Sequence, residues 1–149
     1  MATTTTLYDI SPLITERTAV FPGDVAYGRS ESLSFERGHH LTLSSIKTTL
    51  HIGAHADAPI HYHPQGGGIE TRSAERYIGP AQVIEIALPP SARIRVADLQ
   101  GIEIGASRVL FKTHSFPHPD IWKQDFNSLS PELVSYLVSK GVQLVGIDT

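Results

Sequence analysis

One segment in the first half of the chain, HIGAHADAPIH at positions 51–61, concentrates side chains that can bind a metal ion. It supplies three imidazoles and one carboxylate, from His51, His55, Asp57 and His61. Neutral imidazole nitrogen and carboxylate oxygen suit zinc, with manganese, iron and cobalt as alternatives. Three protein ligands would leave a coordination position for the water that a catalytic site needs. The segment therefore predicts a metal-dependent enzyme.

The spacing within this segment favours a curved, extended chain. The chemical residues occupy odd positions, and the even positions between them are apolar: Ile52, Ala54, Ala56, Ala58 and Ile60. A helix is disfavoured because Gly53 and Pro59 both oppose a helix interior. A straight strand would spread six residues over about 20 Å, beyond the reach of ligands on one ion. We expect the segment to bend at Gly53 and to turn its apolar positions toward a core.

Other histidines have simpler interpretations. His63 follows the cluster and is expected in a solvated loop, with a supporting contact to the site as the alternative. His114 and His118 are four residues apart, but Pro117 and Pro119 prevent a helix that would bring them together. Both are expected in a loop, with a place in the pocket wall as the alternative.

The motif must be positioned by surrounding elements, and several segments have the residue pattern of strands. Residues 41–50 (LTLSSIKTTL) predict a strand that leads into the motif. Further strands are expected at Leu7–Ile10, Val83–Leu88 and Val109–Lys112. The PQGGG segment at 64–68 is expected to be a turn, with a lid as the alternative, and it lacks the ending of a phosphate-binding loop.

The clearest helix is expected after Ser130, which is a good N-cap and is followed by Pro131 at the first helical position. Its apolar stripe would be formed by Leu133, Val134, Leu137 and Val138. Gly141 should end it. A strand at 142–147 would then complete a parallel βαβ unit with the strand before the helix, in a mixed α/β domain. Asp148 follows that strand, at an edge where active sites of α/β sheets gather, but position alone gives it no role.

Composition sets limits on the class of protein. With 149 residues, of which 40% are hydrophobic and 18% charged, residues 1–149 are expected to form a single domain. The formal net charge of −3 gives no basic surface for nucleic acid. No apolar run is long enough to span a membrane, and the N-terminus lacks the pattern of a signal peptide, so a cytoplasmic protein is expected. The absence of cysteine excludes a thiolate metal site and a disulfide scaffold.

The motif HxGxHxDxPxH resembles the signature of the metal-dependent cyclase family, whose best-known members are the bacterial-type kynurenine formamidases (arylformamidases). Similar segments are found along the chain: LYDISPLI (7–14), the aromatic-Pro-Gly-Asp turn (21–24), RVLFKT (108–113) and the stretch 125–149. Two positions differ from the family pattern. Ala54 occupies a position that is commonly threonine, and Phe21 one that is typically tryptophan in kynurenine formamidases.

The resemblance implies a swivelling β/β/α fold, a homodimer, and hydrolysis of N-formyl-L-kynurenine to L-kynurenine and formate in tryptophan degradation. It implies His51, His55 and Asp57 as ligands of Zn²⁺, with two ions per site in the full-length protein and Mn²⁺ as the alternative. His61 would act as general base and then acid, and Phe21 would pack against the aryl ring of the substrate.

Family members continue beyond the GIDT element and contribute a further histidine and glutamate to the metal site. The expectation is therefore that the domain is truncated at its C-terminus, with a one-metal site as the alternative. Another aryl amide, lactam or lactone could be the substrate, and the fold could also bind metal without catalysis. Nothing in the sequence identifies the group that would recognise the amino acid part of N-formylkynurenine.

Overall fold

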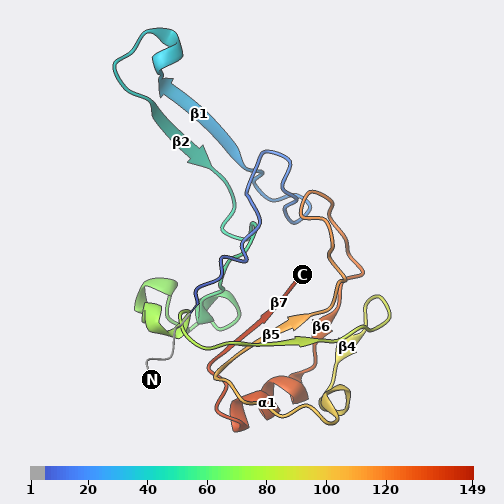
Figure 1. Cartoon of the computed structure of the whole chain (residues 1–149). Coiled ribbons are helices and arrows are strands. Elements are labelled where there is room, and N and C mark those ends of the chain that lie inside the picture. Colours follow the sequence, from blue (N-terminus) through green and yellow to red (C-terminus); the bar gives the residue numbers. More distant parts are fainter. Residues whose placement is uncertain (1–5) are drawn as a thin grey trace. The chain divides into compact units, whose positions relative to one another are not determined.

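A computed structural model describes residues 6–149 of the chain. These residues form two compact units. The first unit contains the described residues up to Ala56 together with His118–Trp122. The second unit contains Asp57–Pro117 and Lys123–Thr149 (Figure 1). None of the described helices is long and apolar enough to cross a membrane.

The first unit is built around an antiparallel hairpin of β1 (Gly28–Leu33) and β2 (Leu43–Lys47). The connection contains a short 3₁₀ helix, η1 (Phe35–Arg37), which ends at Gly38 in the left-handed region. The strand expected within 41–50 is therefore confirmed, over a shorter range. The strand expected at Leu7–Ile10 is wrong: these residues are exposed and pair with no strand among residues 6–149. Without a neighbouring strand, their apolar side chains and backbone groups gain nothing from an extended pairing.

The second unit contains a parallel three-stranded sheet, in the order β3-β5-β7. Its strands are β3 (Gln82–Glu85), β5 (Arg108–Lys112) and β7 (Leu144–Ile147). All three expected strands are confirmed, although the first ends three residues earlier than predicted. Because the strands are parallel, their carboxyl ends meet at one edge of the sheet. The two remaining strands, β4 (Arg93–Ile94) and β6 (Ser128–Leu129), form a separate parallel pair.

The single α-helix among the described residues, α1 (Pro131–Ser139), follows its predicted start closely. The Ser130 hydroxyl accepts a 3.2 Å hydrogen bond from the Leu133 amide, which caps the helix. Gly141 adopts a positive φ of 80° just beyond the helix. β5, α1 and β7 form the expected parallel βαβ unit, because β5 and β7 pair in parallel.

The core of the second unit lies between one face of the sheet and α1. Its buried members come from the strands, the helix and the connections: Ile84, Ile86, Ile94, Leu99, Val109, Phe111, Leu133 and Leu137. Burying each of these side chains contributes about 1.5–3 kcal/mol to folding. Four further 3₁₀ helices lie in the connections: η2 (Pro59–His61), η3 (Ile69–Thr71), η4 (Ala74–Arg76) and η5 (Val96–Leu99). The mixed α/β class is confirmed, whereas a single domain over 1–149 stays a prediction.

Candidate metal centre

The segment 51–61 bends where the sequence predicts that it must. Gly53 has a φ of +57°, a left-handed conformation that glycine adopts at little cost. A methyl group at this position would also lie 2.8 Å from Cγ1 of Ile14. Beyond the bend, Pro59 begins η2, and the His61 amide donates a 2.9 Å hydrogen bond to the Ala58 carbonyl. Glycine is therefore required at the bend for both its backbone freedom and its lack of a side chain.

The expected division of the segment into a core face and a chemical face is wrong. Of the five apolar even positions, Ile52 is buried at 6% exposure, but Ile60 is 56% exposed. The left-handed residue at Gly53 and the 3₁₀ turn at η2 both break the two-residue repeat of an extended chain. The segment is held by Ile52 near its start, and the remaining side chains lie closer to the surface.

His51 and His55 lie side by side across the bend. Nδ1 of His51 is 3.2 Å from Nε2 of His55, and the two rings meet edge to face. Two nitrogens that bind one tetrahedral zinc ion, each at about 2.1 Å, lie about 3.4 Å apart. Nδ1 of His55 lies 3.0 Å from the Gly53 carbonyl oxygen, which would fix the ring and leave Nε2 for a metal. The separation of the two imidazoles therefore suits joint binding of one ion.

A second grouping involves Asp57 and His61. Nε2 of His61 lies 4.0 Å from Oδ2 of Asp57. One ligand atom each from His51, Asp57 and His61 lies within 4.8 Å of the others, so these three could also hold an ion. The donor set of imidazoles and a carboxylate fits a divalent cation such as Zn²⁺. The division of roles, with His55 as ligand and His61 as base, stays a prediction.

A series of hydrogen bonds supports the start of the metal motif. The Thr49 hydroxyl donates a 2.5 Å hydrogen bond to Oδ2 of Asp24, and the Thr49 hydroxyl oxygen accepts a 3.2 Å bond from the His51 amide. The bond from Thr49, with another from the Val25 amide, holds the pKa of Asp24 below its ordinary value. Sequence reasoning found the turn that contains Asp24 but gave no role to Asp24 or Thr49. A threonine two residues before the first ligand was the available signal.

Phe21 begins that turn, which is closed by a 2.9 Å hydrogen bond from the Asp24 amide to the Phe21 carbonyl. Its ring is 61% exposed and meets the ring of Trp122 edge to face, with centroids 5.4 Å apart. An exposed aromatic ring that packs against a second ring can stack on a planar ligand. The part played by Trp122, the one tryptophan of the chain, has no counterpart in the sequence predictions.

His63, His114 and His118 lie in loops, as expected. The His63 amide donates to the Pro59 carbonyl at the end of η2. Neither His114 nor His118 belongs to a helix or strand. His114 nevertheless has specific partners at the end of β5, which no feature of the sequence predicted.

Residues 8–149 match a protein-family model named Cyclase and described as "Putative cyclase". A kynurenine formamidase from Delftia acidovorans (strain DSM 14801 / SPH-1) is 35% identical over 144 residues, which cover 96% of this chain and 68% of that protein. Two solved structures are also similar, each with a TM-score of 0.74 and 95% of this chain covered. One is a potential metal-dependent hydrolase with cyclase activity, with 25% identity and 67% of its chain covered. The other is a predicted metal-dependent hydrolase from Bacillus stearothermophilus, with 27% identity and 68% covered.

Proposed function

The chain belongs to the cyclase family, and on this premise we propose that it is a metal-dependent hydrolase of aryl formamides. Its substrate would be N-formyl-L-kynurenine, which water cleaves to L-kynurenine and formate. The observation that carries this proposal is the 35% identity with a kynurenine formamidase over 96% of the chain. The resemblance of the fold to two metal-dependent hydrolases supports the same class of chemistry.

We infer that His51, His55 and Asp57 bind the metal. The 3.2 Å separation of the two imidazole nitrogens supports this set, and Asp57 lies in the same short segment with a carboxylate that can bridge two ions. When bound, a divalent ion polarises a carbonyl oxygen and makes water more acidic. Zn²⁺ is the proposed ion, with two per site and Mn²⁺ as the alternative.

His61 is the proposed general base and acid. It would take a proton from the attacking water and return it to the aryl amine as the C–N bond of the formamide breaks. Asp57, whose Oδ2 lies 4.0 Å from Nε2 of His61, would orient the imidazole and stabilise its protonated form. A formyl carbon is small, so a compact pocket suffices. Phe21 would pack against the aryl ring, and its 61% exposure leaves the ring surface that this contact needs.

The proposed setting is the cytoplasm, and the family resemblance implies a homodimer. The further histidine and glutamate ligands that the resemblance implies also stay a prediction. Both can be examined together with the activity, because the natural gene product can be purified and its mass and oligomeric state measured.

The test is turnover of N-formylkynurenine by protein of known metal content. We expect the purified protein to contain a divalent ion, to lose activity when a chelator removes it, and to regain activity with Zn²⁺. Activity that survives complete removal of metal would overturn the proposal. A panel of other aryl amides, lactams and lactones would reveal a different substrate, and a closed four-ligand sphere without turnover would identify a non-catalytic metal site.

A further inference from the structure

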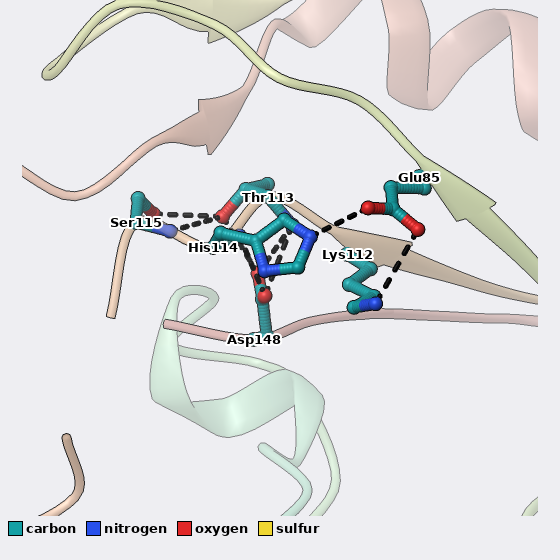
Figure 2. Close-up of polar contacts among 6 residues, drawn as sticks. All are labelled: Glu85, Lys112, Thr113, His114, Ser115 and Asp148. Atoms are coloured by element: carbon teal, nitrogen blue, oxygen red, sulfur yellow. Dashed lines mark hydrogen bonds and ion pairs between the residues drawn. The ribbon is translucent and has the colours of Figure 1, made fainter. Parts of the chain in front are cut away.

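A cluster of charged and hydroxyl side chains lies at the carboxyl edge of the β3-β5-β7 sheet, within the second unit (Figure 2). Glu85 ends β3 and pairs in register with Lys112, which ends β5. Thr113 and His114 continue from β5, and Asp148 follows β7. Ligands of open α/β sheets bind outside the carboxyl ends of the strands, so side chains at this edge are candidates for binding.

Asp148 fixes the backbone that follows β5. Its two carboxylate oxygens accept hydrogen bonds from the Thr113 amide at 2.8 and 3.0 Å and from the His114 amide at 2.9 Å. Oδ1 also accepts a 2.6 Å bond from the Thr113 hydroxyl. Burial raises the pKa of Asp148, but the hydrogen bonds from Thr113 and His114 outweigh this and leave the pKa below its ordinary value. The hydrogen bonds around Asp148 therefore favour its charged carboxylate form.

The network continues from Thr113 to other residues of the second unit. Because the single proton of the Thr113 hydroxyl is given to Asp148, the Ser115 hydroxyl must be the donor in the 2.7 Å bond between the two hydroxyls. The Ser115 oxygen in turn accepts a 2.9 Å bond from the amide of Asn127, a residue buried at 1% exposure. The segment 113–115 is thus tied to the end of β7 on one side and to the loop before β6 on the other.

His114 occupies a strained position within this network. Its φ is +59°, in the left-handed region that non-glycine residues adopt uncommonly, although histidine does so more often than most. Such a conformation costs of order 1 kcal/mol and persists where surrounding contacts impose it, often at functional sites. Asp148 imposes it here through the His114 amide. Asp148 thus fixes the backbone from which the imidazole extends.

From this backbone the imidazole of His114 reaches Glu85. Nε2 of His114 lies 2.6 Å from Oε1 of Glu85, while Oε2 of Glu85 lies 3.3 Å from Nζ of Lys112. The hydrogen bond from His114, followed by that from Lys112, holds the pKa of Glu85 below its ordinary value. The His114 side chain is 53% exposed, and within residues 6–149 its Nδ1 has no hydrogen-bond or ion-pair partner. One nitrogen is therefore anchored and the other can meet a ligand.

The charges around this nitrogen favour an anion. Lys112 neutralises Glu85, so this pair presents no net negative charge to a ligand at Nδ1 of His114. A metal cation at Nδ1 would therefore gain no net attraction from the Lys112–Glu85 pair. A carboxylate, by contrast, would accept a hydrogen bond from Nδ1–H and add a second negative partner to the imidazolium.

We propose that His114 is a substrate-binding residue that recognises a carboxylate group, and that Glu85 and Asp148 are positioning residues that fix its imidazole. The inference rests on the proposed function, because it assigns the recognition of the amino acid carboxylate of N-formylkynurenine. It extends that function by naming the residue that would separate acidic aryl formamides from neutral ones.

The kinetic test compares two substrates in the full-length enzyme. His114→Asn removes the imidazole and suits the left-handed backbone. We expect it to raise KM for N-formylkynurenine about tenfold or more, the usual scale for a lost charged hydrogen bond, and to leave KM for neutral formanilide unchanged. Glu85→Gln should shift KM in the same direction, and Glu85→Asp should restore part of it. His40→Asn, at an exposed histidine of the first unit, is the matched control. An equal change for both substrates, or no change for either, would overturn the inference.

A binding test separates this inference from the proposed function. The imidazole signals of His114, assigned by their loss in His114→Asn, are followed by NMR during titration with benzoate and with neutral benzamide. We expect benzoate to shift them saturably in the millimolar range and benzamide to leave them unmoved. Imidazole signals that do not shift with benzoate, or that shift equally with benzamide, would overturn carboxylate recognition. This holds whether or not the protein hydrolyses formamides. Absence of turnover with intact benzoate binding would instead count against the proposed function alone.

Discussion

The hydroxyl of Thr49 donates a 2.5 Å hydrogen bond to the carboxylate of Asp24 and accepts one from the backbone amide of His51. This single group joins the Phe21–Asp24 turn to the first residue of the metal motif. Because Thr49 is buried at 9% exposure, its two hydrogen bonds have little competition from water. The start of the motif is therefore held by a residue that binds no metal itself.

Replacing Thr49 by valine keeps the shape of the side chain and removes the hydroxyl. We expect metal affinity to fall about tenfold, the lower end of the range for residues that support metal ligands, because His51 loses one of its restraints. Thr49→Ser, which keeps the hydroxyl, is the matched control and should retain most of the affinity. Competition with a chelating dye would measure both variants, and equal affinities for valine and serine would contradict the prediction.

Gly53 is the second element that shapes the metal segment. Gly53→Ala forces a side chain into a backbone with φ of +57° and places its Cβ 2.8 Å from Cγ1 of Ile14. We expect a loss of about 1–2 kcal/mol in the free energy of unfolding, together with weaker metal binding, since the bend must open to relieve the contact. Gly28→Ala is the control, because nothing lies within 4 Å of its added Cβ and its φ is not in the left-handed region. Denaturant unfolding should separate the two variants.

Substitution of His61 and substitution of His51 should have different effects on metal content. His61→Ala is expected to keep nearly all of the metal and to lower kcat by about 10²-fold or more, as for other general acid–base residues. His51→Ala should lose the metal and the activity together. Metal analysis of the two purified variants beside their kcat values provides the measurement. A loss of metal in His61→Ala would instead make His61 a ligand, as its grouping with His51 and Asp57 would allow.

Local signals explain which elements could be predicted from the sequence. The start of α1 is encoded by Ser130 and Pro131, whose capping roles depend on neighbours within one turn. The bend at Gly53 follows from the need to gather ligands that a straight strand would spread apart. Strands β5 and β7 follow from apolar runs that flank the helix. In each case the information lies within a few residues of the feature it specifies.

Features that depend on distant partners could not be predicted. The segment at Leu7–Ile10 has a strand-like composition, but a strand also needs a neighbour, which the residues alone do not reveal. The hydrogen bonds of Asp148 join it to residues 34 and 35 positions earlier, and the pair of His114 and Glu85 spans 29 positions. Asp148 could be placed at an edge of the sheet from its position after a strand, but its partners could not be identified.

Asp148 should also control the stability of the second unit toward acid. Its pKa is lower in the folded protein than the ordinary value of 3.8, so its charged form adds stability that is fully present above about pH 4. As the pH falls through the folded pKa, the carboxylate gains a proton and that contribution is lost. Asp148→Asn mimics the neutral form at every pH and is expected to lower the free energy of unfolding at pH 7 by about 1–2 kcal/mol.

The measurement is urea unfolding of the wild-type protein and the Asp148→Asn variant between pH 7 and pH 3. The difference in stability should be largest at neutral pH and should shrink as the pH falls below 4, because only the wild-type protein has this carboxylate to protonate. Asp125→Asn removes an exposed partner of Lys123 and should change stability little. A difference between wild type and Asp148→Asn that stays constant down to pH 3 would show that the four hydrogen bonds at the end of β5 do not depend on the charge of Asp148.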